Sequence, residues 1–321
     1  MIMILSSLMV VPSLSGHSLP FHSVQAHSVT IPVGNSPAGI QHSPSNDNIY
    51  VANAASSTVS VISDSTNSVT DTILVGRFPI WLEYVPSNNQ LYVTNVFSND
   101  TYVIVSLTNE ALKAIEVGIS PIGIAYDPNN NYLYVGNGED NTVSVMNAAT
   151  ASVIETIPLF SKSNFLAVNF IAYSDINDAL YVSREQPGVV SVINAITKSH
   201  VNDIPVSDTP YGIAYNPANH NLYVASLSSN QVSVIYTLTN SIVDTITVGS
   251  SPVDIVYNPD NHNMYVTNQG SNTVSVIDST TNSVIANIVA GNTPTGITYD
   301  STNKHLYVTN IGSNTVTMIH P

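Results

Sequence analysis

The chain has 321 residues, of which 43% are hydrophobic and only 8% are charged. Its formal net charge is −15, with 6 Lys and Arg against 21 Asp and Glu, so nucleic acid and anionic membrane surfaces are not expected partners, because both require clustered basic side chains. There is no cysteine, which excludes disulfides, thiolate metal sites and covalently attached haem.

The N-terminal segment differs in character from the rest of the chain. Residues 2–12 are apolar, and Val24-Gln25-Ala26 fits the small-residue cleavage site of a secretory signal peptide. No Lys or Arg precedes the apolar run, so a misassigned start codon and a simple leader stay open as alternatives. We expect residues 1–26 to be a signal peptide or leader and residues 27–321 to form one domain. We also expect the mature protein to be extracellular or at the cell surface, without a membrane span.

After the leader, one phrase recurs seven times. It is centred on a Tyr-Val-x-x tetrad whose tyrosines are Tyr50, Tyr92, Tyr134, Tyr181, Tyr223, Tyr265 and Tyr307. Successive tyrosines are 42, 42, 47, 42, 42 and 42 residues apart. A period in the forties that is rich in β formers is typical of propeller blades.

Each copy divides into four short strands separated by turn residues. In the copy at 250–291 we expect strand A at 251–257, strand B at 264–268, strand C at 273–277 and strand D at 283–290. The turns between them are short, which requires antiparallel pairing. Strands B and C are apolar at nearly every position, as expected for sheets that are covered on both faces by neighbouring blades.

Strand D is expected to lie outermost and to close the ring. Its aligned positions include Pro32, Pro158 and Pro205, which are tolerated only at a sheet edge. The last copy stops after strand C, whereas residues 28–33 form a strand D without strands A to C before it. The predicted fold is therefore an all-β, seven-bladed β-propeller of four-stranded antiparallel blades. The N-terminal strand at about 28–33 would complete its last blade.

The phrase YVTN-x-GSNTVSVID-x-TTNSV resembles the repeat of YVTN-type β-propeller proteins, which include domains of archaeal surface-layer proteins and exported bacterial propellers. The resemblance covers residues 28–319 and implies a seven-bladed propeller outside the cytoplasm. It implies little about chemistry, because related propellers include lactonases, streptogramin lyases and binding proteins. Copies four and five depart from the tetrad and read YVSR, ending at Arg184, and YVAS, ending at Ser226.

Candidate site residues are those that break the repeat where the D–A crossings and B–C turns surround one mouth of the channel. The third residue of strand A is glycine in four copies and Trp81, Phe170 or Asp254 in the others, and five extra residues fall near 159–168. The candidate set is Arg77, Phe78, Trp81, Glu83, Phe170, Arg184, Glu185, Tyr211 and Asp254. In the functional interpretation Trp81 stacks on a ligand, and Arg77 or Arg184 binds an anion or a sugar hydroxyl of that ligand. In the structural interpretation the aromatic residues fill the channel and the arginines form ion pairs with Glu185 or Glu83.

No cofactor or metal site is predicted. The histidines His220, His262 and His305 fall in A–B turns of separate copies, and no nucleophile or phosphate-binding motif is present. The tyrosines of strand A are expected to pack between blades with their hydroxyls on polar partners. Asn99 begins a glycosylation sequon in a B–C turn that we expect to be one residue longer than the others.

The predicted function is an exported or cell-surface scaffold without catalysis, which binds a protein or glycan partner at the channel mouth on the D–A/B–C face. The alternative is a lactonase-like propeller hydrolase or lyase with a metal in the channel. Such an enzyme requires carboxylates that converge on the metal, and the only candidate acids in the seven A strands are Glu83 and Asp254.

Overall fold

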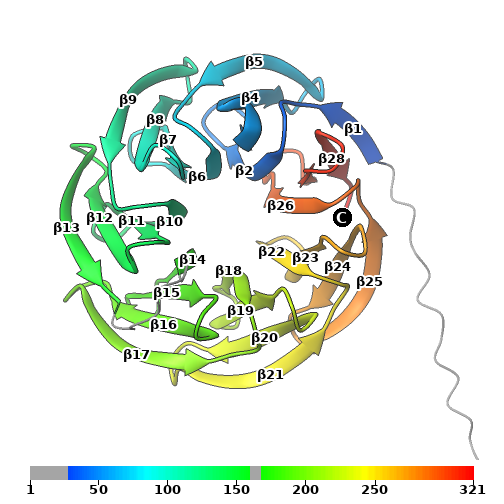
Figure 1. The fold of residues 1–321 in the computed structure, drawn as a ribbon. Coiled ribbons are helices and arrows are strands. Elements are labelled where there is room, and N and C mark those ends of the chain that lie inside the picture. Colours follow the sequence, from blue (N-terminus) through cyan, green and yellow to red (C-terminus); the bar gives the residue numbers. More distant parts are fainter. Residues whose placement is uncertain (1–27, 160–167) are drawn as a thin grey trace, which may run out of the picture.

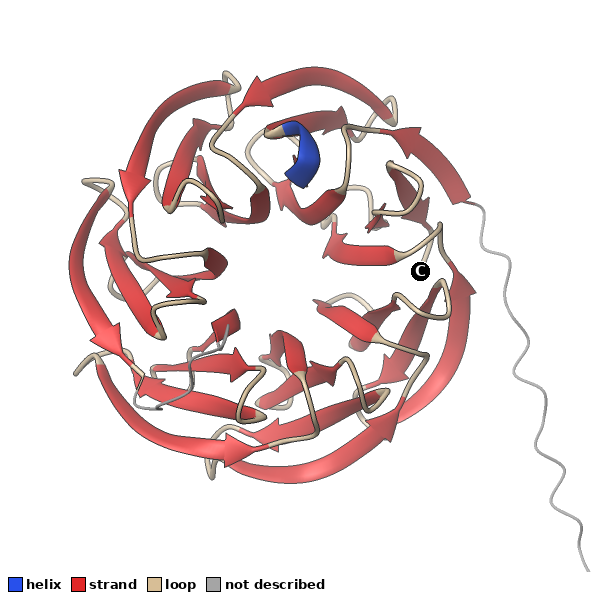
Figure 2. Ribbon diagram, viewed as in Figure 1, coloured by secondary structure: helices blue, strands red, loops and turns tan. Residues whose placement is uncertain are grey.

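The computed structural model describes residues 28–159 and 168–321, which form a closed ring of seven four-stranded sheets (Figure 1). The expected leader and most of the five-residue insertion lie outside the described residues. Apart from one 3-10 turn at Ala54–Ser56, the described elements are all strands (Figure 2). The seven-bladed propeller predicted from the repeat is confirmed.

The sheets, or blades, are numbered in chain order, and each has strands A to D from the channel outwards. The A strands are β2 (Pro37–Ser43), β6 (Pro79–Val85), β10 (Pro121–Asp127), β14 (Val168–Ser174), β18 (Pro210–Asn216), β22 (Pro252–Asn258) and β26 (Pro294–Tyr299). The B strands are β3 (Asn48–Asn53), β7 (Gln90–Asn95), β11 (Tyr132–Asn137), β15 (Ala179–Arg184), β19 (Asn221–Ser226), β23 (Asn263–Asn268) and β27 (Leu306–Asn310).

The C strands are β4 (Thr58–Ser63), β8 (Asp100–Val105), β12 (Thr142–Asn147), β16 (Val189–Asn194), β20 (Gln231–Tyr236), β24 (Thr273–Asp278) and β28 (Thr315–Ile319). The D strands are β5 (Ser68–Leu74), β9 (Glu110–Glu116), β13 (Ser152–Pro158), β17 (Ser199–Pro205), β21 (Ser241–Thr247), β25 (Ser283–Val289) and β1 (Ser28–Pro32). The D strands lie on the rim, as their prolines predicted (Figure 1).

The ring closes in blade 7, where the first strand joins the last three. β1 pairs antiparallel with β28, in a register that runs from Ser28↔Ile319 to Pro32↔Thr315. Ile31 of β1 is only 2% exposed and belongs to the apolar cluster between blades 7 and 1. The closure predicted from the unpaired N-terminal strand is therefore confirmed.

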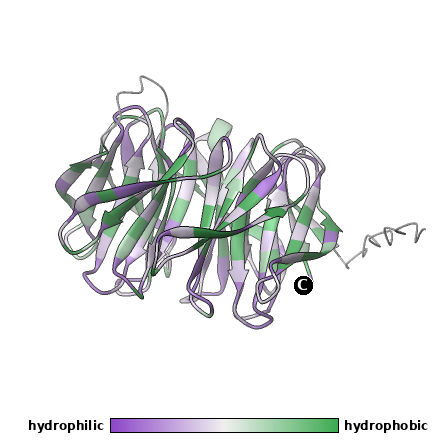
Figure 3. Ribbon diagram, turned by 90° about the horizontal axis from the view of Figure 1, so that it is seen from below, coloured by the Kyte–Doolittle hydropathy of each residue, from purple (hydrophilic) through white to green (hydrophobic). Residues whose placement is uncertain are grey.

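The core consists of seven apolar clusters, each between two adjacent blades. The B and C strands supply most of it, and the tetrad tyrosines lie fully within it. Because these strands are sandwiched between neighbouring blades, both of their faces are apolar. Figure 3 shows the disc from its side, with strands crossing its thickness and turns on both faces. The D–A crossings and B–C turns lie on one face, and the A–B and C–D turns lie on the other.

Candidate functional site

A cavity of about 600 Å³ occupies the centre of the ring, and strand A of every blade contributes to its wall. The wall begins at the third residue of strand A, such as Trp81, and continues to A–B turn residues such as Pro128 and Pro217. The cavity therefore opens towards the A–B/C–D face. This is the face opposite to the one expected from the sequence.

Two aromatic side chains, Trp81 and Phe170, line the other end of the cavity, and Tyr211 packs against the second. The rings of Trp81 and Phe170 meet edge to face with centroids 4.4 Å apart, and Phe170 lies 5.0 Å from Tyr211. Trp81 belongs to blade 2 and Phe170 to blade 4, so the contact passes blade 3, where the third residue is Gly123. Trp81 also requires a glycine at position 39 in the neighbouring blade, because a Cβ at Gly39 would lie 2.9 Å from Trp81. The aromatic cluster thus forms the floor of the cavity.

In two blades the third residue of strand A lies within an interruption of the A–B pairing, whereas Trp81 of blade 2 is paired with Thr94 just after one. In blades 4 and 6 the A–B register shifts across the segments Val168–Ile171 and Pro252–Ile255, which contain Phe170 and Asp254. Bulges of this kind re-aim a side chain and are common next to functional sites. The irregularity explains how residues of the innermost strand reach the channel axis.

Three carboxyl groups line the cavity: Asp175 in an A–B turn, and Asp254 and Glu83 on the A strands of different blades. Asp254 in β22 is 4% exposed, and its oxygens accept hydrogen bonds from the backbone N–H groups of Ile255 at 2.8 Å and Ile297 at 2.9 Å. Burial raises the pKa of Asp254 to about 7, although these two hydrogen bonds oppose the shift. The sequence prediction that Asp254 lies at the channel agrees with this position.

Glu83 in β6 has a similar environment. Its side chain is partly exposed to the cavity, but the ring surrounds it on all sides. This burial raises the pKa of Glu83 to about 8, and a hydrogen bond from the backbone of Tyr126 in the next blade opposes the shift. Among the described residues, no Lys, Arg or His lines the cavity. The two carboxyl groups therefore have no basic side chain as a partner there.

Tyrosines of strand A surround the open end of the cavity: Tyr126, Tyr173, Tyr215, Tyr257 and Tyr299. Their rings also pack against the interblade clusters, as the sequence predicted, and their hydroxyls have polar partners. Tyr215 bonds Nδ1 of His220 at 3.0 Å, and Tyr257 bonds Nδ1 of His262 at 2.7 Å. The sequence interpretation missed their place in the cavity wall. The signal available for four of the five was a tyrosine followed five residues later by Asn, Asp or His, whereas Tyr299 is followed by Lys304.

Two other candidates lie outside the cavity, on the D–A/B–C face. Phe78 packs against Phe97 with ring centroids 4.6 Å apart, and the carbonyl of Arg77 accepts a hydrogen bond from the backbone N–H of Phe97 at 3.1 Å. The Arg77 side chain is exposed. These residues join a D–A crossing to a B–C turn, and the structure does not bring them together with Trp81 in the cavity.

Arg184 lies inside blade 4, with 0% of its side chain exposed. It donates a hydrogen bond to Ser191 at 3.3 Å and lies 4.0 Å from the Asp203 carboxylate. Burial lowers the pKa of its guanidinium, and Asp203 opposes that shift. Its acidic neighbour is therefore Asp203 rather than Glu185 or Glu83. Glu185 lies in the following turn, where its charge adds to the effect of burial in raising the pKa of Tyr211.

Asn99 lies exposed at the end of its B–C turn, and its Oδ1 accepts a hydrogen bond from the backbone of Ser120 at 3.0 Å. The turn between β7 and β8 has four residues, as do the B–C turns of the other blades. The expected extra residue was therefore wrong, because the two strands end in the same register as their counterparts. Glycosylation at Asn99 stays a prediction.

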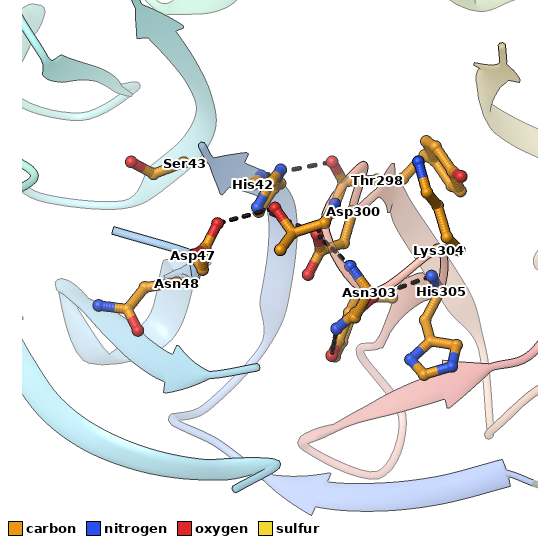
Figure 4. Close-up of polar contacts among 12 residues, drawn as sticks. His42, Ser43, Asp47, Asn48, Thr298, Asp300, Asn303, Lys304 and His305 are labelled. Carbon is orange, nitrogen blue, oxygen red and sulfur yellow. Dashed lines mark hydrogen bonds and ion pairs between the residues drawn. The ribbon is translucent and has the colours of Figure 1, made fainter. Parts of the chain in front are cut away.

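A second titratable pair lies at the seam between blades 1 and 7, where His42 takes the place of the strand A tyrosine. Its Nε2 is 3.1 Å from Oδ1 of Asp300, and both residues are buried (Figure 4). Burial lowers the pKa of His42, and the Asp300 charge opposes this. Asp300 also accepts a hydrogen bond from the backbone N–H of Thr302 at 2.8 Å, which fixes the A–B turn of blade 7.

In the part of the chain that the structure describes, no group of three or more His, Cys, Asp or Glu side chains is placed to hold a metal ion. No helix among the same residues is long and apolar enough to cross a membrane.

Solved structures of known proteins share this architecture. Hydrazine synthase of Kuenenia stuttgartiensis matches with a TM-score of 0.79 at 18% identity, over 89% of this chain and 96% of that one. A streptogramin B lyase matches with a TM-score of 0.79 at 15% identity, over 91% of this chain and 96% of that one. Virginiamycin B lyase from Staphylococcus aureus matches with a TM-score of 0.78 at 15% identity, over 92% of this chain and 99% of that one.

No protein-family model and no curated protein sequence matches the chain. The identities to the solved structures are low, so these likenesses speak for the architecture alone. The chain is a seven-bladed β-propeller of four-stranded antiparallel blades.

Proposed function

We propose that the protein is an exported propeller that binds a small molecule in its central cavity and does not transform it. The observation that carries the proposal is the cavity itself. Its volume of about 600 Å³ lies within the range of small-molecule sites, about 300–1,000 Å³. Its wall combines aromatic rings with a few fixed polar groups, which is the composition of such sites.

In this proposal the ligand enters from the A–B/C–D face. Trp81 and Phe170 cover the opposite end, and the tyrosines of strand A surround the open one. This differs from the expectation of a site among the D–A and B–C loops. Arg77 and Phe78 would then hold the scaffold together rather than contact the ligand.

Export and membership in the YVTN-type propellers are parts of the same proposal. They are supported by the apolar leader, by the small number of charged residues and by the recurring tetrad. A protein or glycan partner at the cell surface remains a prediction from the sequence. The enzymatic alternative is supported by the likeness of fold to two lyases and by the two channel acids, Glu83 and Asp254. The size and composition of the cavity support binding directly, and for that reason we place binding first.

The cavity contains its own reporter. Trp81 is the single tryptophan of the chain and lies in the cavity floor, so its fluorescence responds to anything that enters. A mixed panel of neutral, anionic and cationic small molecules is titrated into the wild-type protein, and Trp81 emission and the melting temperature are both recorded. We expect the compounds that raise the melting temperature to change the emission as well.

Two variants then locate the site. Trp81→Ala removes one of the two aromatic rings at the closed end of the cavity and should weaken ligand binding by about tenfold or more, equivalent to about 1.4 kcal/mol. Trp81→Phe keeps an aromatic floor and should retain most of the affinity, which guards against a folding defect in the alanine variant. Phe97→Ala removes an exposed aromatic ring on the D–A/B–C face and should leave the affinity for the ligand unchanged. Ligands that depend on Phe97 but not on Trp81 would place the site among the loops instead.

A further inference from the structure

We infer that the ligand of the central cavity is an elongated organic cation with an ammonium group at each end, of the alkyl diamine or polyamine class. Glu83 on one wall and Asp254 on the other would receive the two ends. This inference rests on the proposed function, because it assumes that the cavity binds a small molecule.

The charges of the cavity favour a cation. Its wall contains Glu83, Asp254 and Asp175 but, among the described residues, no basic side chain. Ionised carboxylates that are removed from water are costly unless an opposite charge accompanies them. A cationic ligand would supply that charge, whereas an anionic ligand would add to the repulsion.

The hydrogen bonding of the two acids leaves room for a donor. Asp254 accepts one hydrogen bond on each oxygen, and Glu83 accepts one from the backbone of Tyr126. A carboxylate offers about four acceptor positions. The backbone therefore fixes each group in place, and acceptor capacity remains for an ammonium group, which donates three hydrogen bonds and accepts none.

The positions of the two acids favour a dication over a monocation. β6, which carries Glu83, belongs to blade 2, and β22, which carries Asp254, belongs to blade 6. The two strands face each other across the channel (Figure 1). One ammonium group can pair with one wall, while a chain with a charge at each end can pair with both. The tyrosine rings and Trp81 between the two walls provide apolar and π surfaces for the methylene chain and for the charges.

The test uses a matched set of probes. These are α,ω-diaminoalkanes of increasing length, the monoamine and the diol of matching length, and an alkane dicarboxylate, each titrated into the full chain by calorimetry and by Trp81 fluorescence. We expect one diamine length to bind best, at least about tenfold more tightly than its monoamine, as for loss of a charge-assisted contact. The diol and the dicarboxylate should not bind measurably.

Three variants assign the contacts. Glu83→Gln removes a charge but keeps an oxygen that can accept the backbone N–H. Asp254→Asn removes a charge and keeps an acceptor for one of the two backbone N–H groups, so its melting temperature is measured alongside its affinity. Each should reduce the affinity of the best diamine to about that of the monoamine. Glu110→Gln removes the same charge on the outer strand β9 of blade 2, away from the cavity, and should change nothing. Binding should persist in about 0.3 M salt, where attraction to exposed acidic surface is screened.

The pH dependence of diamine affinity provides an independent test. Burial holds the two carboxyl groups partly protonated near neutral pH, with pKa values of about 7 and about 8, so binding of a cation releases protons. The affinity should therefore rise from about pH 6 to about pH 8.5, while alkyl ammonium groups stay charged to about pH 10.

The outcomes separate this inference from the proposed function. If Glu110→Gln weakens diamine binding as much as Glu83→Gln does, the attraction is to the acidic surface in general and the inference is wrong. If neutral compounds bind in a manner that depends on Trp81 and is indifferent to Glu83 and Asp254, the inference fails but the proposed function stands. If no probe of any charge changes Trp81 emission or the melting temperature, both fail.

Discussion

The four residues of a tetrad have different tasks. In blade 2, Tyr92 donates a hydrogen bond to the carbonyl of Ala148 at 3.0 Å, and Thr94 donates one to the carbonyl of Ile122 at 2.7 Å. Both acceptors belong to blade 3, so two side chains of each tetrad of this kind fasten one blade to the next. The valine between them, Val93, is fully buried in the apolar core.

The asparagine of the tetrad is also structural. Asn137 is buried, donates hydrogen bonds to Thr142 and Ser144 at 2.9 Å each, and accepts one from the backbone of Gly118 at 3.1 Å. In the five copies that keep the asparagine, the D–A crossing carries a glycine whose added Cβ would lie 2.4–2.7 Å from the asparagine side chain. The pair thus joins a D–A crossing to a B–C turn.

Copies four and five lose both members of this pair. Their asparagines are replaced by Arg184 and Ser226, and the glycine positions hold Phe160 and Ser207. The sequence interpretation treated Arg184 as a functional exception on the loop face. The joint loss of the glycine was the signal that the position is a packing position, with Asp203 as its acidic neighbour.

Asn137→Ala should therefore destabilise the ring. It removes three hydrogen bonds and leaves Ser144 buried and two partly buried partners without Asn137, at a cost of about 2–3 kcal/mol. In a domain of this size the melting temperature should fall by roughly 4–8 °C. The matched control is Asn292→Ala, because Asn292 is exposed and its side chain bonds only a neighbouring threonine and, at 3.5 Å, a carbonyl. Equal melting temperatures for the two variants would show that the asparagine column does not hold the crossings.

At the scale of the element, the strand pattern was predictable from the sequence and the cavity was not. In the copy at 250–291 each strand lies within two residues of its predicted bounds, since turn residues and β-branched runs recur there at a fixed period. The direction in which the cavity opens depends on contacts between blades 2, 4 and 5, through Trp81, Phe170 and Tyr211. No periodic signal contains such contacts, because each of these residues occurs in one copy only.

The strand β1 offers a direct test of ring closure. Ile31→Ala should cost about 2–4 kcal/mol, because the side chain is buried between blades 7 and 1. Val29→Ala in the same strand should have little effect, because Val29 is exposed. Deletion of residues 27–33 should lower the melting temperature further than either substitution, since it also removes all pairing with β28. An unchanged melting curve after the deletion would contradict closure by this strand.

At the scale of the whole molecule, buried titratable groups set the pH range of stability. The pKa of His42 is lowered by burial, so its contribution to stability is present above about pH 6.5 and is lost as the pH falls below that value. The pKa values of Glu83 and Asp254 are raised to about 8 and about 7, so their contribution is present below about pH 4 and is lost as the pH rises through 7 to 8.

We therefore expect the melting temperature of the wild-type protein to fall as the pH rises from about 4 to about 8, because two acids lose their contribution over this range and His42 alone opposes them below about pH 6.5. His42→Tyr, which introduces the residue of the other blades, should make this fall steeper below about pH 6.5. Glu83→Gln should make the fall shallower. Melting curves of the three proteins between about pH 4 and pH 9 measure this. Parallel profiles for all three would show that other groups control the pH dependence.

The pairing of β1 with β28 has a consequence for the order in which the blades follow one another along the chain. Ser28 and Ile319 are opposite one another in this register, so the two ends of the ring are neighbours. A short peptide could join them, and a new opening in a D–A crossing elsewhere would leave every interblade cluster intact. The packing between blades therefore does not determine which D–A crossing must be open in the chain. Circular permutants that begin at a different blade should reach the same disc.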